Sequence, residues 1–477
     1  MARINTNVSS LVANTNLAKS QAALNTSLQR LSSGMRINSG ADDPAGLIAS
    51  ERLKSEIQGI STAIDNGTRA TNVITTADGA LSEVSNLLVS IKGLVVQAAN
   101  TGGMSQDEID ANQLQVDSAI ASITRISNST SFAGLNLLNG SLGYITSGVA
   151  TSALHDVHIY GAAFGTQATI PVVVNVLQSA QPATMRFNAS AIATSVTLEI
   201  AGSVGVQVMS FVSGTKASAI AFAINRVSDS TGVSAAMTSA TNASSGITFT
   251  TLGYGSKQFI SVSVLGDSSA FVTTDAQGAA ENRATGRDVT ASVNGAAAIG
   301  NGLNISVNTP ALTMSMNIDA GLGTGTKSFT ITGGGALFQL GPQVQSNQQV
   351  SIAIDSVSAS RLGDASDGYL TDVTTGGSAN LSKDPGRASR IIDAAINQVS
   401  ELRGRLGAFE QNTLQTNINS LQVAMENVSS SESTIEDTDF AQETANLTRN
   451  QILVQAGTSV LATANQTPQS VLKLLGG

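Results

Sequence analysis

The chain of 477 residues contains no cysteine and no tryptophan, and only 12% of its residues are charged. Without cysteine, neither a disulfide framework nor a thiolate metal site or nucleophile is possible. Aromatic residues make up 3%, so tight cores must be built from Leu, Ile, Val and Ala. The formal net charge of -9 argues against nucleic-acid binding, which requires basic clusters to neutralise phosphates. Stability must therefore come from packing or from assembly.

Long apolar runs are missing too. The stretch MARINTNVSSLVANTNL has no apolar segment of about 7 to 15 residues and no cleavage pattern, so it does not resemble a general secretory signal. No run approaches the ~20 apolar residues that a membrane helix requires, and we expect no membrane span. The length predicts two to four domains. Taken alone, these features suggest a cytoplasmic protein.

The N-terminal region has helical periodicity. The spacing of one helix face predicts a helix from about residue 5 to residue 33, and Gly34 should stop it. This face carries Leu17, Leu24, Leu28, Leu31 and Met35. After a polar break, Pro44 suits a first helical turn, and Asp42 or Asp43 can cap it.

A sustained heptad pattern predicts that this second helix continues to about residue 99, a length that implies a coiled-coil partner. A third helix is expected over about 105–127. The partner lies at the other end of the chain, in a periodic run over 392–435, and a last amphipathic segment covers 438–464. The expected coiled-coil seam consists of Leu53, Ile57, Ile60, Ile64, Ile74, Leu81, Leu88, Leu402, Leu406, Leu414, Ile418 and Leu421.

The middle of the chain, about 144–378, is rich in Gly, Ser and Thr. Alternation of apolar and polar residues predicts half-buried strands in SVTLEIAG, GVQVMSFV, GITFTT, FISVSVLG, LNISVN and SFTITGG. One segment, TKASAIAFAINRV, instead predicts a helix with Ile220, Ala223, Ile224 and Val227 on one face. We therefore expect an α+β protein whose β-rich middle forms about two subdomains.

Several motifs resemble those of bacterial flagellins, the subunits of the flagellar filament. The N-terminal motifs are RINTNVSSLVANTNL, SLQRLSSGMRINSGADDPAGLIASERL, VVQAANTG and SFAGLNLLNG; the C-terminal motifs are RLGAFEQNTLQTNINSL, ESTIEDTDFAQETANLTRNQIL and QAGTSVLATANQTPQSVLKLLGG. In the middle, Val196 to Met237 is similar to the strand, strand, helix, strand insert of many flagellin outer domains.

The resemblance implies an architecture and a function. It implies a long antiparallel helical coiled-coil core built from both termini, with a β-rich variable outer region. Residues 1–43 and 440–477 would form the inner tube of the filament and the spoke, 44–143 and 379–439 the outer tube, and 144–378 the surface domains. The chain would polymerise head-to-tail into the extracellular filament for swimming motility, after export in unfolded form by the flagellar type III apparatus. The alternative is the hook-filament junction protein, which has flagellin-like ends.

Exposed apolar seams at both termini favour association between subunits. When subunits associate through unlike surfaces and do not close into a ring, they form a helical filament. Before assembly, the two ends would be disordered. We hypothesise that the inner tube is formed by Leu11, Leu17, Leu24, Leu28, Leu31, Phe440, Leu447, Leu453, Val460 and Leu461.

The break between the first two helices corresponds to the spoke of flagellins. The resemblance implies that it bends the chain from the inner to the outer tube, contacts neighbouring subunits and affects supercoil handedness. Its residues are Gly34, Arg36, Asn38, Gly40, Asp42, Asp43 and Pro44. The plain alternative is an intramolecular turn without a role in assembly.

The resemblance also implies partners. An export chaperone would bind the C-terminal apolar face of Val471, Leu472, Leu474 and Leu475, as a helix in a groove; alternatively, these residues only pack in the inner tube. The filament cap and hook-filament junction proteins would be neighbours in the flagellum.

A Toll-like receptor reads the long-helix surface of some flagellins. This sequence retains Leu94 and Gln97 but has Ser90 and Gln115 where the family motif has an arginine and an acidic residue. Losing these charged groups removes charge-assisted contacts, so weak or absent receptor activation is expected.

Other motifs give little support for enzymatic chemistry, and we expect no cofactor. His155 and His158 are spaced to share a metal, but solvent-facing strand histidines are the favoured interpretation. GLGTGT at Gly321 lacks a following helix and a P-loop lysine, so it predicts a turn. The carboxylates of DDPAG are expected to cap a helix rather than to perform acid/base chemistry. A role of the β region as an adhesin or glycan carrier remains a third possibility.

Overall fold

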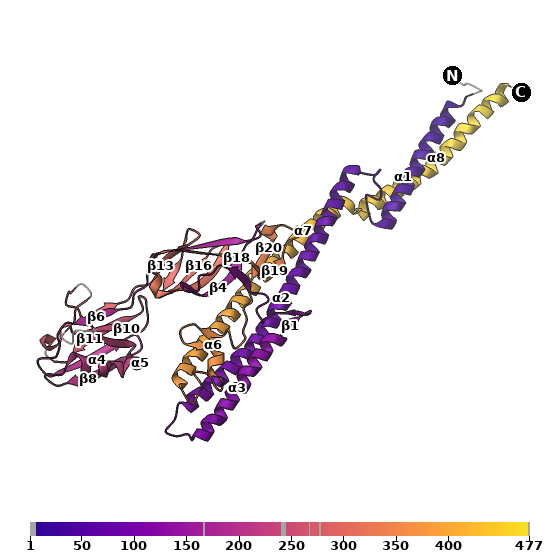
Figure 1. Ribbon diagram of the computed structural model, residues 1–477. Helices are drawn as coiled ribbons and strands as arrows, with labels where there is room; N and C mark the ends of the chain where they lie inside the picture. Colours follow the sequence, from indigo (N-terminus) through magenta and orange to yellow (C-terminus); the bar gives the residue numbers. More distant parts are fainter. Residues whose placement is uncertain (1–5, 166, 240–244, 267, 276–277, 476–477) are drawn as a thin grey trace. The chain divides into compact units, whose positions relative to one another are not determined.

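The computed structural model describes residues 6–165, 167–239, 245–266, 268–275 and 278–475, with the side chains of Ser268 and of residues 467–475 left outside that description (Figure 1). The chain divides into two compact units, which are described separately. The terminal unit comprises Met1–Arg69, Gln339–Val344 and Asn412–Gly477. The central unit comprises Ala70–Phe338 and Gln345–Gln411.

Helices dominate both ends of the chain, as the periodicity predicted. They are α1 (Val8–Ser33), α2 (Pro44–Ala98), α3 (Gln106–Ser129), α4 (Ala217–Asn225), α5 (Ser228–Thr231), α6 (Pro385–Phe409), α7 (Thr416–Glu436) and α8 (Phe440–Leu475). Short 3-10 turns lie at Ser268–Ala270, Ala320–Leu322, Ser346–Gln348 and Leu370–Val373.

The first and last helices begin later than expected because preceding residues cap them. The Asn7 side chain accepts a hydrogen bond from the Ser10 amide, so α1 begins at Val8. Asp439 accepts hydrogen bonds from the Ala441 and Gln442 amides, so α8 begins at Phe440.

The periodic run over 392–435 is not one continuous α-helix. A π-helical turn at Glu410–Gln415 separates α6 from α7. The apolar pattern steps eight residues from Leu406 to Leu414, one more than a heptad, and a wider turn absorbs such an extra residue. Both leucines are fully buried.

In the central unit, residues 70–98 of α2 contact α6. The predicted seam residues of this unit (Ile74, Leu81, Leu88, Leu402 and Leu406) are 0 to 4% exposed. The Asp78 carboxylate pairs with Arg403 at 2.8 Å, and Lys92 pairs with Asp393 at 2.6 Å. Because the higher-numbered residue of α2 pairs with the lower-numbered residue of α6, the two helices run antiparallel.

The long helix α2 is apolar although it contains no unbroken run of about 20 apolar residues. By length and composition alone, α2 is apolar enough to cross a membrane. The reason is that, in an 18-residue window of this helix, small uncharged residues separate the leucines, isoleucines and valines and at most two residues are charged. The same composition is found in core helices of soluble proteins, and its heptad residues Ile74, Leu81 and Leu88 are buried within protein.

The middle of the chain is β-rich. Its strands are β1 (Ser131–Phe132), β2 (Leu135–Asn136), β3 (Tyr144–Ser147), β4 (Leu154–Ala162), β5 (Ile170–Gln178), β6 (Thr184–Phe187), β7 (Val196–Gly202), β8 (Val206–Phe211), β9 (Val233–Met237), β10 (Ile247–Thr251), β11 (Phe259–Val264), β12 (Arg283–Thr285), β13 (Thr290–Val293), β14 (Ala296–Ala297), β15 (Ile299–Asn301), β16 (Asn304–Asn308), β17 (Leu312–Ile318), β18 (Gly325–Gly334), β19 (Ala336–Gln339), β20 (Gln349–Ile352), β21 (Gly363–Asp364) and β22 (Gly368–Tyr369). All six predicted strand segments contain a strand, and the predicted helix is α4.

These strands surround two apolar clusters. The first lies between the sheets β14-β13-β5-β18-β3 and β15-β16-β17-β4 and includes Val174, Met314 and Ile331. The second lies among the sheets β6-β10-β9 and β12-β11-β7-β8 and helix α4, and includes Phe249 and Ile220. Strand pairing is antiparallel throughout these sheets, for example Leu198 with Met209.

The remaining motifs have structural roles. His155 and His158 lie on β4, 3.4 Å and 3.9 Å from carboxylate oxygens of Asp319 and Asp355, and both are partly exposed. Among the described residues no group of three His, Cys, Asp or Glu side chains could hold a metal ion. GLGTGT contains a turn after Asp319, whose side chain accepts a hydrogen bond from the Gly321 amide.

Candidate functional site

Helices α1 and α8 lie side by side in the terminal unit (Figure 1). Ala13 and Leu17 are buried in this pairing, and Gly457 permits the close approach, because a Cβ there would lie 3.2 Å from Leu17 Cδ1. Near one end, the Asn7 side chain donates to the Ala464 carbonyl at 2.8 Å. The pair is thus joined by apolar and polar contacts.

The outer surfaces of the pair remain apolar and uncovered. Among the predicted inner-tube residues only Leu17 is buried, while Leu24, Leu31, Leu447 and Leu461 are half-buried. The other five are between 47 and 66% exposed: Leu11, Leu28, Phe440, Leu453 and Val460. Val8, Val12 and Ile452 are exposed as well, although they lie outside the predicted inner-tube residues. A single chain therefore cannot cover this surface.

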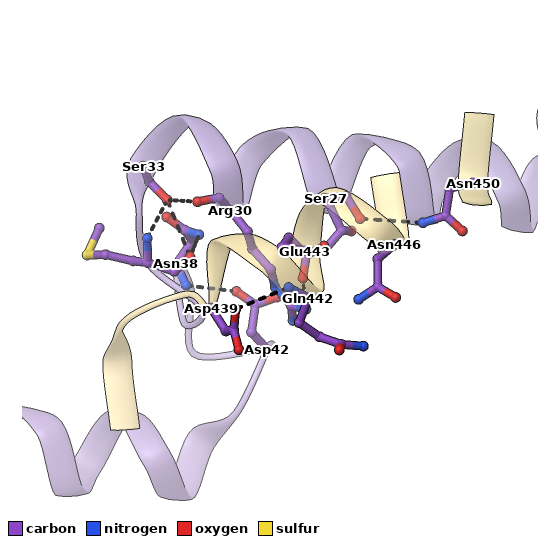
Figure 2. Close-up of polar contacts among 12 residues, drawn as sticks. Ser27, Arg30, Ser33, Asn38, Asp42, Asp439, Gln442, Glu443, Asn446 and Asn450 are labelled. Carbon is purple, nitrogen blue, oxygen red and sulfur yellow. Dashed lines mark hydrogen bonds and ion pairs between the residues drawn. The ribbon is translucent and has the colours of Figure 1, made fainter. Parts of the chain in front are cut away.

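Polar contacts secure the other end of the pair (Figure 2). The Asn450 side chain donates to the Ser27 hydroxyl at 3.4 Å, and Arg30 lies 3.8 Å from the Glu443 carboxylate. Glu443 is 7% exposed, so its charge is held beside the arginine inside the helix pair. These contacts fix the helix pair immediately before the corner that follows α1.

The corner after α1 begins at Gly34. This residue has φ = 75°, a left-handed conformation that favours glycine, and its amide donates to the Arg30 carbonyl at 2.9 Å. The helix therefore ends where the sequence predicted. Ile37 in the following turn is 3% exposed, so the corner has a small apolar core of its own.

The two aspartates of the corner have different tasks. Asp43 caps α2, because its Oδ1 accepts from the Gly46 amide at 2.9 Å. Asp42 closes the turn itself: its Oδ2 accepts from the Asn38 amide at 3.1 Å (Figure 2). The same oxygen accepts from the Ser39 amide at 2.8 Å and from the Ser39 hydroxyl. The hydroxyl and amide of Ser39 lower the pKa of Asp42.

The crowded glycine of the corner is Gly46, which our list of spoke residues omitted. A Cβ at this position would lie 2.4 Å from Asp43 Oδ2 and 2.7 Å from Ile37 Cδ1. By contrast, a Cβ at Gly40 would make only an ordinary contact, 3.6 Å from Leu47. The cap and the buried isoleucine together explain why Gly46 has to be small.

A second segment of the chain pairs with the corner. Met35 and Asp437 form an antiparallel bridge, the Arg36 amide donates to the Glu436 carbonyl at 2.6 Å, and the Thr438 amide donates to the Gly34 carbonyl at 2.9 Å. The Arg36 guanidinium also donates to the Ile435 carbonyl at 2.5 Å. The link between α1 and α2 is thereby tied to the link between α7 and α8.

A buried carboxylate lies beneath this pairing. Glu436 is 5% exposed and accepts hydrogen bonds from the Ser50 hydroxyl and from Lys54 Nζ, the latter at 2.5 Å. The Lys54 and Ser50 hydrogen bonds lower the pKa of Glu436, and the Glu436 hydrogen bond raises the pKa of Lys54. Burial, followed by the contact with Glu436, raises the pKa of neighbouring Glu432. No local pattern in the amino-acid sequence marks this cluster.

Seam residues of the terminal unit are less buried than those of the central unit. Ile60, Leu414 and Ile418 are buried, whereas Leu53, Ile57, Ile64 and Leu421 are half-buried. Gly67 faces Ile418, and a Cβ at this position would lie 2.9 Å from the isoleucine.

The predicted receptor-facing residues lie on α2 and α3. Ser90, Gln97 and Gln115 are exposed, and Leu94 is half-buried. The Ser90 hydroxyl donates to the Asn86 carbonyl of its own helix at 2.9 Å. This surface therefore offers uncharged polar groups at the two altered positions.

Comparisons with known protein families identify both helical ends and part of the middle. Residues 4–142 match the bacterial flagellin N-terminal helical region, 389–475 match the flagellin C-terminal helical region, and 195–253 match the flagellin hook IN motif. The structure of FliC from Burkholderia pseudomallei is similar at 18% identity with a TM-score of 0.24, covering 72% of this chain and 99% of that one.

Full-length relatives are more informative. The chain is 31% identical to a flagellin of Salmonella rubislaw, 33% identical to the B-type flagellin of Pseudomonas aeruginosa and 31% identical to flagellin A of Vibrio cholerae, each over 99% of both chains. These matches do not favour the junction-protein alternative. With long helices at both ends, the middle β-rich and an apolar surface uncovered on α1 and α8, the chain belongs to the bacterial flagellin family and is a structural subunit of the extracellular flagellar filament that serves motility.

Proposed function

We propose that α1 and α8 form the inner tube of the filament and that subunits associate through the exposed apolar residues of this pair. The observation that carries the proposal is the exposure of Leu11, Leu28, Phe440, Leu453 and Val460 on a helix pair that is already joined internally. Burying such surface against other subunits yields about 25 cal/mol per Å². Repeated between unlike surfaces, this association extends into a helix.

The domain assignment follows from the same proposal. Residues 1–43 and 440–477 supply the inner tube and spoke, 44–143 and 379–439 the outer tube, and 144–378 the surface domains. The corner from Gly34 to Gly46 then acts as the spoke and contacts neighbouring subunits. Its support is the exposure of Ser39, Gly40 and Asp42 on a corner whose backbone is fixed by internal hydrogen bonds.

The assembly proposal is tested by charging the exposed surface. Leu11→Glu combined with Phe440→Glu should abolish polymerisation of purified protein, because two carboxylates would have to be buried between subunits. Val212→Glu, at a side chain that is 72% exposed in the β-rich region, is the matched control and should polymerise normally. Electron cryomicroscopy of the products reads the result. Normal tubes from the double variant would contradict the proposal.

Export and chaperone binding complete the proposed function. The chain would leave the cell unfolded through the flagellar type III apparatus, with the apolar face of Val471, Leu472, Leu474 and Leu475 covered by a chaperone beforehand. These four side chains lie outside the described residues, and the proposal rests on their amphipathic spacing. The cap and junction proteins would be its neighbours at the ends of the filament.

Receptor recognition is proposed to be weak or absent. Ser90 and Gln115 supply neither the guanidinium fork nor the carboxylate of the receptor-binding flagellins, and Ser90 bonds its own helix. Purified monomer should therefore activate receptor-expressing cells poorly, and Ser90→Arg combined with Gln115→Glu should increase the response. Strong activation by the unaltered monomer would refute this.

A further inference from the structure

A polar cleft in the central unit contains none of the exposed α1 and α8 residues through which subunits are proposed to associate. It lies between β4, the segment after β20 and helix α6, and encloses about 610 Å³. A smaller cavity of about 70 Å³ adjoins it and shares His158, Asp355, Arg361 and Gln398. The larger volume falls in the range of pockets that bind small ligands.

The cleft is rigidly built. The Ala353 amide donates to the Tyr160 carbonyl at 3.1 Å, which ties the segment after β20 to β4. Gln398 of α6 donates to the Gly363 carbonyl and accepts from the Gly363 amide, which ties α6 to the same segment. The Tyr144 hydroxyl accepts from the Ala162 amide at 2.9 Å. The walls therefore come from three elements held in register by hydrogen bonds.

Several polar groups in these walls remain available. The Asp355 carboxylate has no hydrogen bond within the described residues, and its ion-pair contacts to His158 and Arg405 are long, at 3.9 and 3.8 Å. The Arg361 side chain is exposed and makes no hydrogen bond or ion pair there. In the adjoining smaller cavity, Arg405 stacks on the Tyr160 ring at 3.8 Å, and its Nε and Nη1 are buried without a hydrogen-bond partner in the described part of the chain. Buried polar groups without partners are rare and point to a ligand or an ordered solvent molecule.

The charges of the lining nearly balance. Arg361, Asp156 and Asp355 line the cleft, and Arg405 and Glu401 line the smaller cavity beside it. A phosphate or carboxylate ligand would approach these anions unfavourably, and an apolar ligand would leave the polar lining unpaired. An uncharged ligand that both donates and accepts hydrogen bonds fits best. Hydroxyl groups do both, and the rings of Tyr144 and His158, which line the cleft, offer apolar faces beside them.

We infer that this cleft binds a neutral carbohydrate of about disaccharide size. Sugar hydroxyls donate to Asp355 and Asp156 and accept from Arg361, and the apolar face of a pyranose ring packs on the aromatic side of the cleft. The contacts belong to the central unit and leave the α1 and α8 surface free. The filament subunit thus carries a binding site separate from its assembly surface.

The test measures binding of lactose, maltose and chitobiose to the full-length protein by saturation-transfer NMR, with inorganic phosphate and glutamate as charged competitors. Asp355→Asn and Arg361→Ala should each weaken binding at least about tenfold, since each removes a hydrogen bond to a charged group. Asp229→Asn and Arg226→Ala, remote in sequence and absent from the cleft lining, are the matched controls and should bind normally.

A second readout needs no variant. Hydrogen exchange of the unaltered chain should show slower exchange over residues 353–363 when the sugar is present. The inference is overturned if none of the three disaccharides binds at millimolar concentration, if the cleft variants bind as tightly as the controls, or if phosphate or glutamate takes the cleft in preference to the sugars.

Discussion

The terminal helices and the β-rich middle differ in how far they bury their apolar side chains. In the middle, Phe249, Val174 and Met314 are enclosed in two clusters and are at most 1% exposed. On α1 and α8, side chains of similar type lie in the open. The difference teaches that the middle has what it needs to fold within one chain, whereas the ends reach their lowest free energy only when other subunits cover them.

The largest expected effect comes from breaking the enclosed region. Phe249→Ala should destabilise the second β cluster by about 3–5 kcal/mol, because a fully buried ring is replaced by a cavity. Polymerisation through the terminal helices should persist. Hydrogen exchange over β6, β9 and β10, read alongside electron micrographs of the polymer, checks both parts. Loss of filaments with an intact β region would contradict the separation of roles.

A medium effect is expected at the corner. Gly46→Ala places a methyl group against the Asp43 cap and Ile37, and should destabilise the terminal unit by about 1–3 kcal/mol. Gly79→Ala in α2 is the matched control, since a Cβ there meets nothing within 4 Å, and it should stabilise the helix by about 0.5–1 kcal/mol. The melting temperatures of the two filaments should therefore move in opposite directions.

The smallest effect on stability is expected from the ion pair between the buried Glu436 and Lys54. The pKa of Glu436 is lowered from 4.5 in the folded chain. Its carboxylate therefore stabilises the folded state fully above pH 4.5, and this stabilisation is lost as the pH falls through the lower folded pKa. The pKa of Lys54 is raised from 10.5 in the folded chain. Its ammonium group therefore stabilises the folded state fully below pH 10.5, and this stabilisation is lost as the pH rises through the folded pKa. Glu436→Gln should cost about 1 kcal/mol at neutral pH, since Lys54 is partly exposed, and should remove this part of the acid sensitivity.

Filament depolymerisation temperature at pH 7 and pH 4 measures that effect. Glu432→Gln is the control: it removes a neighbouring charge whose pKa is raised by burial, so the filament should be unchanged or slightly more stable at pH 7. Equal acid sensitivity of the Glu436→Gln filament and the unaltered filament would show that the acid response arises elsewhere.

Local patterns predicted much of the fold. Helix spacing placed α1, α2, α3 and α8 within a few residues at their N-terminal ends, and alternation identified strands such as β7 and β18. The π-helical turn was missed although the eight-residue step from Leu406 to Leu414 was visible, because a continuous helix was assumed across it.

The candidate site was predictable only in part. Gly34 and the aspartate cap follow from rules about helix ends, and the apolar residues of α1 and α8 follow from periodicity. Contacts between distant segments could not be anticipated: Ser50 and Lys54 meet Glu436 across more than 380 residues, and no periodic pattern marks them. The crowding at Gly46 likewise depends on Ile37 turning inward, a three-dimensional fact.

Hydrogen bonds join Gly34 and Arg36 to Ile435, Glu436 and Thr438, and we call this paired segment the neck. It closes about 400 residues of the chain into one loop. The entropy of closing a flexible loop grows only with the logarithm of its length, so doubling the enclosed chain costs about 0.6 kcal/mol. Segments inserted or removed beyond the neck therefore change little at the ends that the neck holds together. The terminal helices can keep one assembly geometry while the enclosed sequence lengthens, shortens or diverges.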